Sequence, residues 1–306
     1  MKGIELAEQF YNEYKIDLQD NFPDYVNRIA IGLAGQGSEC YGYDDEYSRD
    51  HDYKVGFCLW LTRKDEEAIG FKLMRWYNNL PKEYSGISMR YNTGNGEKLG
   101  VQTIPYFFDN LIGMSTPPST PMQWLSISEQ ALANATNGKV FVDRLGEFST
   151  FRETLIKGMP LDVVKKKLSA HLALMAQSGR YNYERCILHG EVVSAQLSLN
   201  EFVDHAVSAI FNLNRAYRPF YKWTFRALKD LPLLSNLALP LSQLLTNTIE
   251  DTAKKKAIES VIDSVCREVE KQELSLSKGC DIDELAYSVQ SSITNRQLLS
   301  MHIMEY

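Results

Sequence analysis

The sequence has few cysteines and no long apolar run, and both absences narrow the classes of protein it can be. The five cysteines, at positions 40, 58, 186, 266 and 280, are odd in number and form no C-x-x-C pair. Neither a disulfide framework nor a zinc site of that type is therefore indicated. No segment approaches the ~20 apolar residues of a membrane-spanning helix, and the N-terminus mixes acids with helically spaced apolar residues, unlike a signal peptide. We expect a soluble, cytoplasmic protein with no membrane partner.

An excess of basic residues is also absent. The 39 acidic residues outnumber the 33 basic ones, which leaves a formal net charge of −6. Such a chain has no general attraction for nucleic acid or anionic lipid, and the sequence shows no basic run. Any bound phosphate would have to be held locally, and a nucleic acid partner is disfavoured without being excluded.

The composition is that of an ordinary globular protein. With 306 residues, 44% of them hydrophobic, the chain is long enough for one large domain or two smaller ones. After an amphipathic N-terminal helix, alternating apolar residues predict strands and a three-to-four spacing predicts a helix. The expected strands are 27–35, 51–62, 86–91 and 98–104, and the expected helix is 65–80.

A proline-rich segment, "MSTPPSTP" at 114–121, suggests a domain boundary because proline resists both helices and central strands. Beyond it only "KVFVD" at 139–143 reads as a strand, and the rest favours helices, among them 197–217 and 249–274. The sequence thus predicts an α+β protein. A small mixed-sheet domain, 1–115, is followed by a mainly helical domain, 116–306.

The segment "GLAGQGSECYGYDDEYSRDHDYKVGFCLWL", at 32–61, carries the most chemical information. Asp50 and Asp52 share one face of an extended strand, where two carboxylates repel each other unless a divalent cation lies between them. Gly37-Ser38 follows the preceding strand and is expected to begin a short helix, a place where backbone amides and a hydroxyl can hold phosphate. The neighbouring acids 44–46 have a second interpretation as a solvated loop.

This order of strand, Gly37-Ser38, about a dozen residues and Asp50-x-Asp52 entering a second strand resembles the nucleotidyltransferase superfamily related to DNA polymerase beta. More closely, "YDDEYSRDHDYKVGFCLWL", "EQALANATNGKVFVDRLGEF" and "YRPFYKW" resemble an uncharacterised bacterial family with a nucleotidyltransferase-like core and a helical C-terminal part. The resemblance implies that Asp50 and Asp52 hold one or two magnesium ions and that Gly37 and Ser38 seat a nucleoside triphosphate.

Three further positions follow from the resemblance. A later strand of the superfamily often supplies a third carboxylate, but this chain has Gln102 there, and a neutral amide cannot act as a general base. Glu97 or Asp109 could substitute for it. Lys222 is implied to reach the triphosphate, with Arg218 as a second candidate. The alternative for Lys222 is a surface lysine whose stem lies along a neighbouring aromatic ring.

The leading hypothesis is a magnesium-dependent nucleotidyltransferase that transfers a nucleoside monophosphate from a nucleoside triphosphate to a small-molecule or protein acceptor. The runner-up is a nucleotide-binding regulatory or antitoxin-like protein with weak chemistry, which Gln102 favours. A third hypothesis, a helical interaction protein with a vestigial N-terminal domain, leaves Asp50-x-Asp52 without a reason. The acceptor, RNA ends included, and the preferred base stay open.

Overall fold

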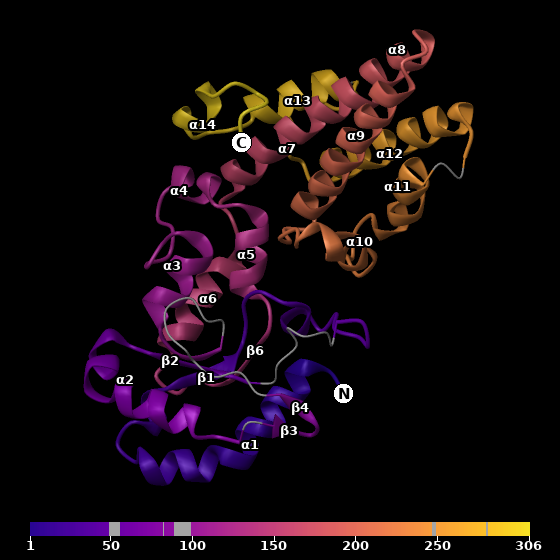
Figure 1. The fold of residues 1–306 in the computed structure, drawn as a ribbon. Helices are drawn as coiled ribbons and strands as arrows, with labels where there is room; N and C mark the ends of the chain where they lie inside the picture. The colour runs from indigo at the N-terminus through magenta and orange to yellow at the C-terminus, as the bar shows by residue number, and fades with distance from the viewer. Residues whose placement is uncertain (49–55, 82, 89–98, 247–248, 280) are drawn as a thin grey trace. The chain divides into compact units, whose positions relative to one another are not determined.

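A computed structural model describes residues 1–48, 56–81, 83–88, 99–246, 249–279 and 281–306 (Figure 1). Their contacts form two compact units. The N-terminal unit comprises Met1–Pro118 and Ile127–Lys157, and the C-terminal unit comprises Ser119–Ser126 and Gly158–Tyr306. The sequence interpretation drew one boundary, after residue 115. The contacts place Ile127–Lys157 with the N-terminal unit instead, because its strand pairs with the sheet there.

The N-terminal unit is built on a mixed sheet with the strand order β5-β2-β1-β6. The central strand β1 is antiparallel to both β2 and β6, whereas β2 and β5 are parallel. The α+β class with an N-terminal sheet and a helical remainder is confirmed. The strands are β1 (Ala30–Leu33), β2 (Cys58–Leu61), β5 (Gly100–Thr103) and β6 (Lys139–Val142), and a separate hairpin pairs β3 (Glu83–Tyr84) with β4 (Ile87–Ser88).

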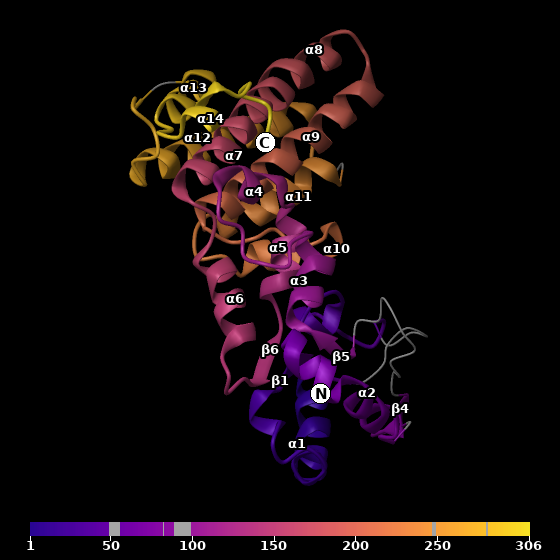
Figure 2. The ribbon, with the colours of Figure 1, turned by 90° about the vertical axis from the view of Figure 1, so that its left-hand side faces the viewer.

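Both faces of the sheet are covered by helices because β2 carries large apolar side chains in both directions. On one face, Leu59 and Leu61 join Phe57 in a core with α1 (Gly3–Asn21) and α2 (Arg63–Asn78). On the other, Trp60 stacks on Phe148 at 3.9 Å between ring centroids and meets Phe107 edge-on at 5.2 Å. This second layer consists of α3 (Ile104–Ile112), α5 (Glu129–Thr136) and α6 (Glu147–Lys157) (Figures 1 and 2).

Local capping explains where the helices after β2 and β5 begin. The Thr62 hydroxyl, directly after β2, accepts from the Asp65 amide, and the Thr103 hydroxyl, at the end of β5, accepts from the Tyr106 amide. Asp65 also accepts two bonds from the Arg28 guanidinium, at 2.8 and 3.0 Å. The helix predicted at 65–80 is present as α2 and begins two residues earlier than expected.

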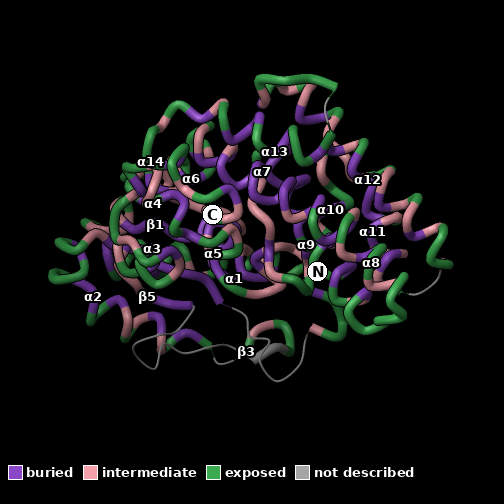
Figure 3. Tube along the Cα trace, turned by 90° about the horizontal axis from the view of Figure 1, so that it is seen from above, coloured by how far each residue is buried: buried purple, intermediate pink, exposed green. Residues whose placement is uncertain are grey.

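The regular secondary structure of the C-terminal unit is entirely helical in its described residues. Its core is centred on α7 (Leu161–Met175) and α9 (Val192–Leu213), both largely buried in Figure 3. The helices predicted at 197–217 and 249–274 correspond to α9 and α12 (Asp251–Lys271). The remaining elements are α4 (Pro121–Ser126), a π-helix (Ala176–Asn182), α8 (Tyr183–Leu188), α10 (Tyr221–Lys229), a 3-10 helix (Ser235–Leu237), α11 (Ala238–Leu245), α13 (Ile282–Ser291) and α14 (Arg296–Ser300).

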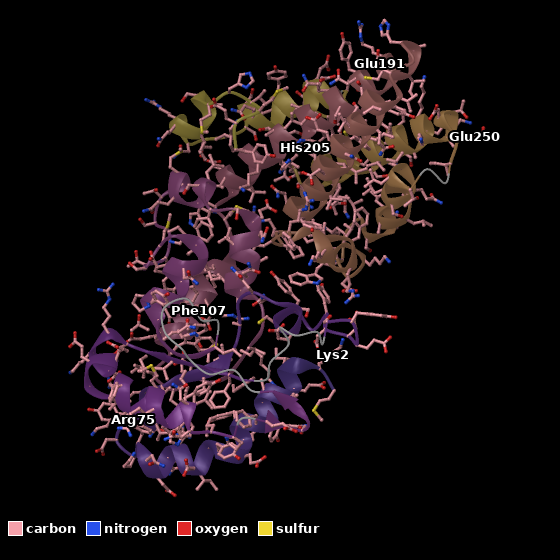
Figure 4. The ribbon with its side chains drawn as sticks, viewed as in Figure 1. Lys2, Arg75, Phe107, Glu191, His205 and Glu250 are labelled. Carbon is pink, nitrogen blue, oxygen red and sulfur yellow. The ribbon has the colours of Figure 1, made fainter. Side chains whose placement is uncertain are left out.

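Two buried polar contacts in this unit involve Lys166 and a pair of histidines. The ammonium of Lys166, which is fully buried, donates to the carbonyls of His302 and Ile303 at 2.7 and 3.1 Å. Its burial lowers the pKa of Lys166 to about 8. His205, labelled in Figure 4, has its Nδ1 3.1 Å from Nδ1 of His171, so one ring donates and the other accepts. None of the helices in the described part of the chain combines the length and apolar content that crossing a membrane requires.

The N-terminal core generates a stability prediction. Phe57→Ala removes a fully buried ring between α1, α2 and β2 and should destabilise the protein by about 3–5 kcal/mol. Phe71→Ala is the matched control, because 68% of the Phe71 surface is exposed, and it should change stability by less than about 0.5 kcal/mol. Urea unfolding of both variants measures the difference, and equal effects would contradict the core assigned to Phe57.

Candidate functional site

The turn that follows β1 requires glycine at two positions. Gly35 and Gly37 have φ angles of 113° and 119°, in the left-handed region that residues with a Cβ rarely adopt. Ser38 then begins a 3-10 helix, Ser38–Tyr41, in which the Cys40 amide donates to the Gly37 carbonyl at 3.2 Å. The short helix predicted at Gly37-Ser38 is therefore present. Gly37 and Ser38 are both half-buried, which leaves part of the turn open to a ligand.

Asn137 fastens this turn to the start of β6. The Gly35 amide donates to Oδ1 of Asn137 at 2.9 Å, and Nδ2 of Asn137 donates to the Gly35 carbonyl at 2.7 Å. The next residue, Gly138, passes so close to β1 that a Cβ there would lie 2.0 Å from the Leu33 carbonyl oxygen. The turn and the start of β6 are thus fixed against each other although about a hundred residues separate them in the sequence.

Two further side chains support the same region. Nη2 of Arg152 donates to the carbonyls of Thr136, Asn137 and Gly138 at 2.7 to 3.3 Å, and burial lowers the pKa of Arg152. The Tyr41 hydroxyl donates to Oδ1 of Asn134 at 2.7 Å, and burial raises the pKa of Tyr41. Sequence reasoning missed these supports, because nothing in the spacing of Asn134, Asn137 and Arg152 indicates that they contact the Gly35 turn.

The predicted metal ligands Asp50 and Asp52 lie outside the described residues, as does Glu97. Within the described part of the chain, no group of three or more histidine, cysteine, aspartate and glutamate side chains is placed to hold a metal ion. The two aspartates therefore stay predictions from the sequence.

The acids before Asp50 divide into two kinds. Asp44 is only 2% exposed, and its Oδ2 accepts from the Gly3 amide at 2.8 Å at the start of α1, where a negative charge is favourable. The Asp44 carbonyl also accepts from Nζ of Lys2, which Figure 4 labels near the N-terminus. Asp45 and Glu46 are exposed. The solvated-loop interpretation thus fits Asp45 and Glu46 but is wrong for Asp44.

Gln102 lies in β5, in register with Trp60 of β2. Partners in parallel strands point to the same side of a sheet, so Gln102 is half-buried on the face covered by α3 and α6. Its neighbour Val101 packs against the opposite core. Asp109, one of the proposed substitutes for a third carboxylate, is exposed on α3 beyond the end of β5.

The two predicted residues of the C-terminal unit have different surroundings. The Arg218 guanidinium donates to Oδ1 of Asp204 at 2.5 Å and to the Ser208 hydroxyl at 2.7 Å, which fastens it to α9. Lys222 is exposed in the first turn of α10. Arg218 thus has a structural role in this state, whereas the Lys222 ammonium is accessible.

A cavity of about 500 Å³ lies where β2 and β5 end, in the N-terminal unit. Thr62 and Arg63 follow β2 into it, and Ile104 and Pro105 follow β5. None of the described residues that the sequence analysis selected lines this cavity. It is therefore separate from the Gly35 turn. Its lining combines Arg63 and Glu147 with hydroxyl and apolar groups, a mixture that indicates no particular chemistry.

Comparison with known proteins gives one family. The model of a family described as "Domain of unknown function (DUF4037)" matches residues 124–224. The matched region runs from α4 to the first turn of α10 and includes Asn137 and Arg152, which fix the Gly35 turn, but neither Gly37 nor Ser38. No curated protein matches the chain. The chain is therefore similar, over this region, to a family whose function is uncharacterised.

The Asn137 contacts generate a prediction about the turn. Asn137→Ala removes two hydrogen bonds to Gly35 and should destabilise the N-terminal unit by about 1–3 kcal/mol. Amide exchange of Gly35 to Ser38 should become faster, because these residues lose their anchor to β6. The control Asn12→Ala alters an exposed asparagine of α1 and should leave both measurements unchanged. Unchanged exchange in Asn137→Ala would show that the turn is held by other contacts.

Proposed function

We propose that the protein is a magnesium-dependent nucleotidyltransferase-like enzyme that transfers a nucleoside monophosphate from a nucleoside triphosphate to a hydroxyl of a small-molecule or protein acceptor. The observation that carries the proposal is the fixed Gly35–Ser38 turn between β1 and the segment that leads into the antiparallel strand β2. The resemblance to the nucleotidyltransferase superfamily rests on this order, in which a strand is followed by a Gly-Ser turn and then by a second strand.

Each part of the site has a distinct task in this proposal. The Gly35–Ser38 turn offers close backbone approach and a hydroxyl donor to the triphosphate. Asp50 and Asp52 would supply the hard oxygen ligands that magnesium prefers, and a magnesium ion held there would neutralise charge on the phosphate oxygens. Lys222 is a further candidate for the triphosphate, on the resemblance alone. The acceptor oxygen bonds to the α-phosphorus while the bond to pyrophosphate breaks.

Gln102 supports a second candidate function. A neutral amide cannot take the proton that the acceptor hydroxyl loses, and the exposed Asp109 lies on the helix after β5. A protein that keeps the triphosphate turn but lacks a base at this place would bind a nucleotide and turn it over poorly. This favours a nucleotide-binding regulatory or antitoxin-like role as the alternative.

The first test concerns the aspartates. Asp50→Asn combined with Asp52→Asn should weaken magnesium-dependent nucleotide binding at least about tenfold, because the metal loses both charged ligands. Isothermal titration with a non-hydrolysable triphosphate in the presence and absence of magnesium measures the change. The matched control is Asp20→Asn with Asp24→Asn, two exposed aspartates of the same unit, which should bind like the wild type. Unaltered magnesium dependence in the folded Asp50/Asp52 variant would refute the metal assignment.

The second test separates the enzyme from the regulator. Release of pyrophosphate is measured for the wild type and for Gln102→Glu with a panel of acceptors. Under the regulatory alternative the wild type binds nucleotide without turnover, and the added carboxylate should create or raise turnover by at least about tenfold. A wild-type rate of about 1 s⁻¹ or more would exclude that alternative. Wild-type turnover that Gln102→Glu leaves unchanged would show that position 102 does not face the reacting groups.

A further inference from the structure

One face of α10 concentrates positive charge that the composition of the whole chain conceals. Lys222, Arg226 and Lys229 are spaced at i, i+4 and i+7, so they lie on one side of the helix, and all three are exposed. They span about 10 Å along its axis. Residues 215–229 contain five basic residues and no acid, in a chain whose net charge is −6. The five are Arg215, Arg218, Lys222, Arg226 and Lys229.

An exposed aromatic ring adjoins this charge. Tyr221 precedes Lys222 and is 69% exposed. Its ring lies 4.2 Å, centroid to centroid, from that of Phe220, which in turn lies 6.2 Å from the half-buried Trp223. The Tyr221 ring is thereby backed by a second ring while much of its surface stays open to solvent. We call Lys222, Arg226 and Lys229 the α10 basic face; Tyr221, one helical position before Lys222, flanks it.

The segment that carries this face is held in shape from both ends. Oδ1 of Asn214 accepts from the Leu233 amide at 2.9 Å, and Nδ2 of Asn214 donates to the Leu233 carbonyl at 3.0 Å. The Thr224 hydroxyl donates to the Pro219 carbonyl at 3.0 Å, which fixes the entry into the helix. The backbone that carries the face is therefore fixed before a partner binds, and only the exposed side chains remain to be ordered.

We propose that the α10 basic face binds single-stranded nucleic acid, with the three cations on successive phosphates and the Tyr221 ring stacked on a base. A row of cations beside an exposed aromatic ring matches a polyanion that carries planar bases. An acidic protein surface would match the positive charge equally well, so the exposed Tyr221 ring, on which a base can stack, is what favours nucleic acid. The proposal does not depend on nucleotidyl transfer.

A lipid surface fits the same charge less well. An amphipathic helix that lies on a membrane inserts its apolar side among the acyl chains. In α10 that side is already used, because Thr224 and Leu228 are 2% and 0% exposed and Phe225 packs against the core of the C-terminal unit. The helix has no comparable apolar surface left for a bilayer.

The experiment uses the full chain and fluorescence anisotropy with a labelled oligouridylate of about 15 nucleotides, at several salt concentrations between about 50 and 200 mM. Arg226→Gln with Lys229→Gln should weaken binding about tenfold or more at the lowest salt. It should also reduce the slope of the logarithm of the association constant against the logarithm of the salt concentration by about 1.4. Each phosphate contact on a single strand contributes about 0.7 to this slope, and the variant loses two cations. Lys222, a candidate for the triphosphate, is left intact, so a failure here is distinct from a failure of nucleotide binding.

The matched control is Lys256→Gln with Arg267→Gln, which removes one lysine and one arginine from exposed positions of α12 in the same unit. It should change affinity less than about twofold. Tyr221→Ala should weaken binding of the oligonucleotide at least about fivefold but leave binding of inorganic polyphosphate unchanged. The proposal is overturned if the wild type does not bind at low salt or if the control loses as much affinity as the α10 variant. Tighter binding to polyglutamate or to phosphatidylserine vesicles would assign the face to an acidic protein or to a membrane instead.

Discussion

Burial of β2 on both faces is the constraint on which the N-terminal unit depends. From Phe57 to Leu61 no residue has exposed surface, because α1 and α2 cover one side and the aromatic residues of α3 and α6 cover the other. Sliding this strand by one residue would exchange its two sets of side chains between cores of different shape, so its register is strongly specified. The groups at its end gain fixed positions as a result, such as Thr62, which caps α2.

The sequence could predict those helices and strands that produce a short-range pattern of apolar residues. The alternation in 27–35, the helical spacing in 197–217 and the single strand at 139–143 all correspond to elements of the structure. The pairing of the strand at 139–143 could not be predicted, because the sequence of a strand does not specify which other strand it pairs with. It joins β1 through a register that shifts between Ile31 and Gly32. The proline-rich segment therefore suggested a single boundary after residue 115, whereas the contacts also assign Ile127–Lys157 to the N-terminal unit.

The residues of the candidate site likewise divide into those with a local sequence signal and those without one. Gly37-Ser38 could be selected because glycine at a strand end is a local signal, and the two positive φ angles give the physical reason. Asn137 and Arg152 act on that turn from far along the chain, and ordinary polar residues of this kind carry no local signal. The cluster of basic residues on α10 carries no local sequence signal for a related reason. Lys222, Arg226 and Lys229 are interrupted by aromatic and apolar residues and become one face only when the helix forms.

The late position of β6 in the chain has a consequence for synthesis on the ribosome. The edge of β1 that pairs with β6 ends at Leu33, whereas β6 ends at Val142, 109 residues later. At a translation rate of about 5–20 residues per second, this edge waits roughly 5–20 s for its partner strand. During that time its unpaired amides and carbonyls can pair with another nascent chain. Slow elongation between β1 and β6 is therefore expected to lower the yield of folded protein, and a fragment that stops before β6 keeps that edge open permanently.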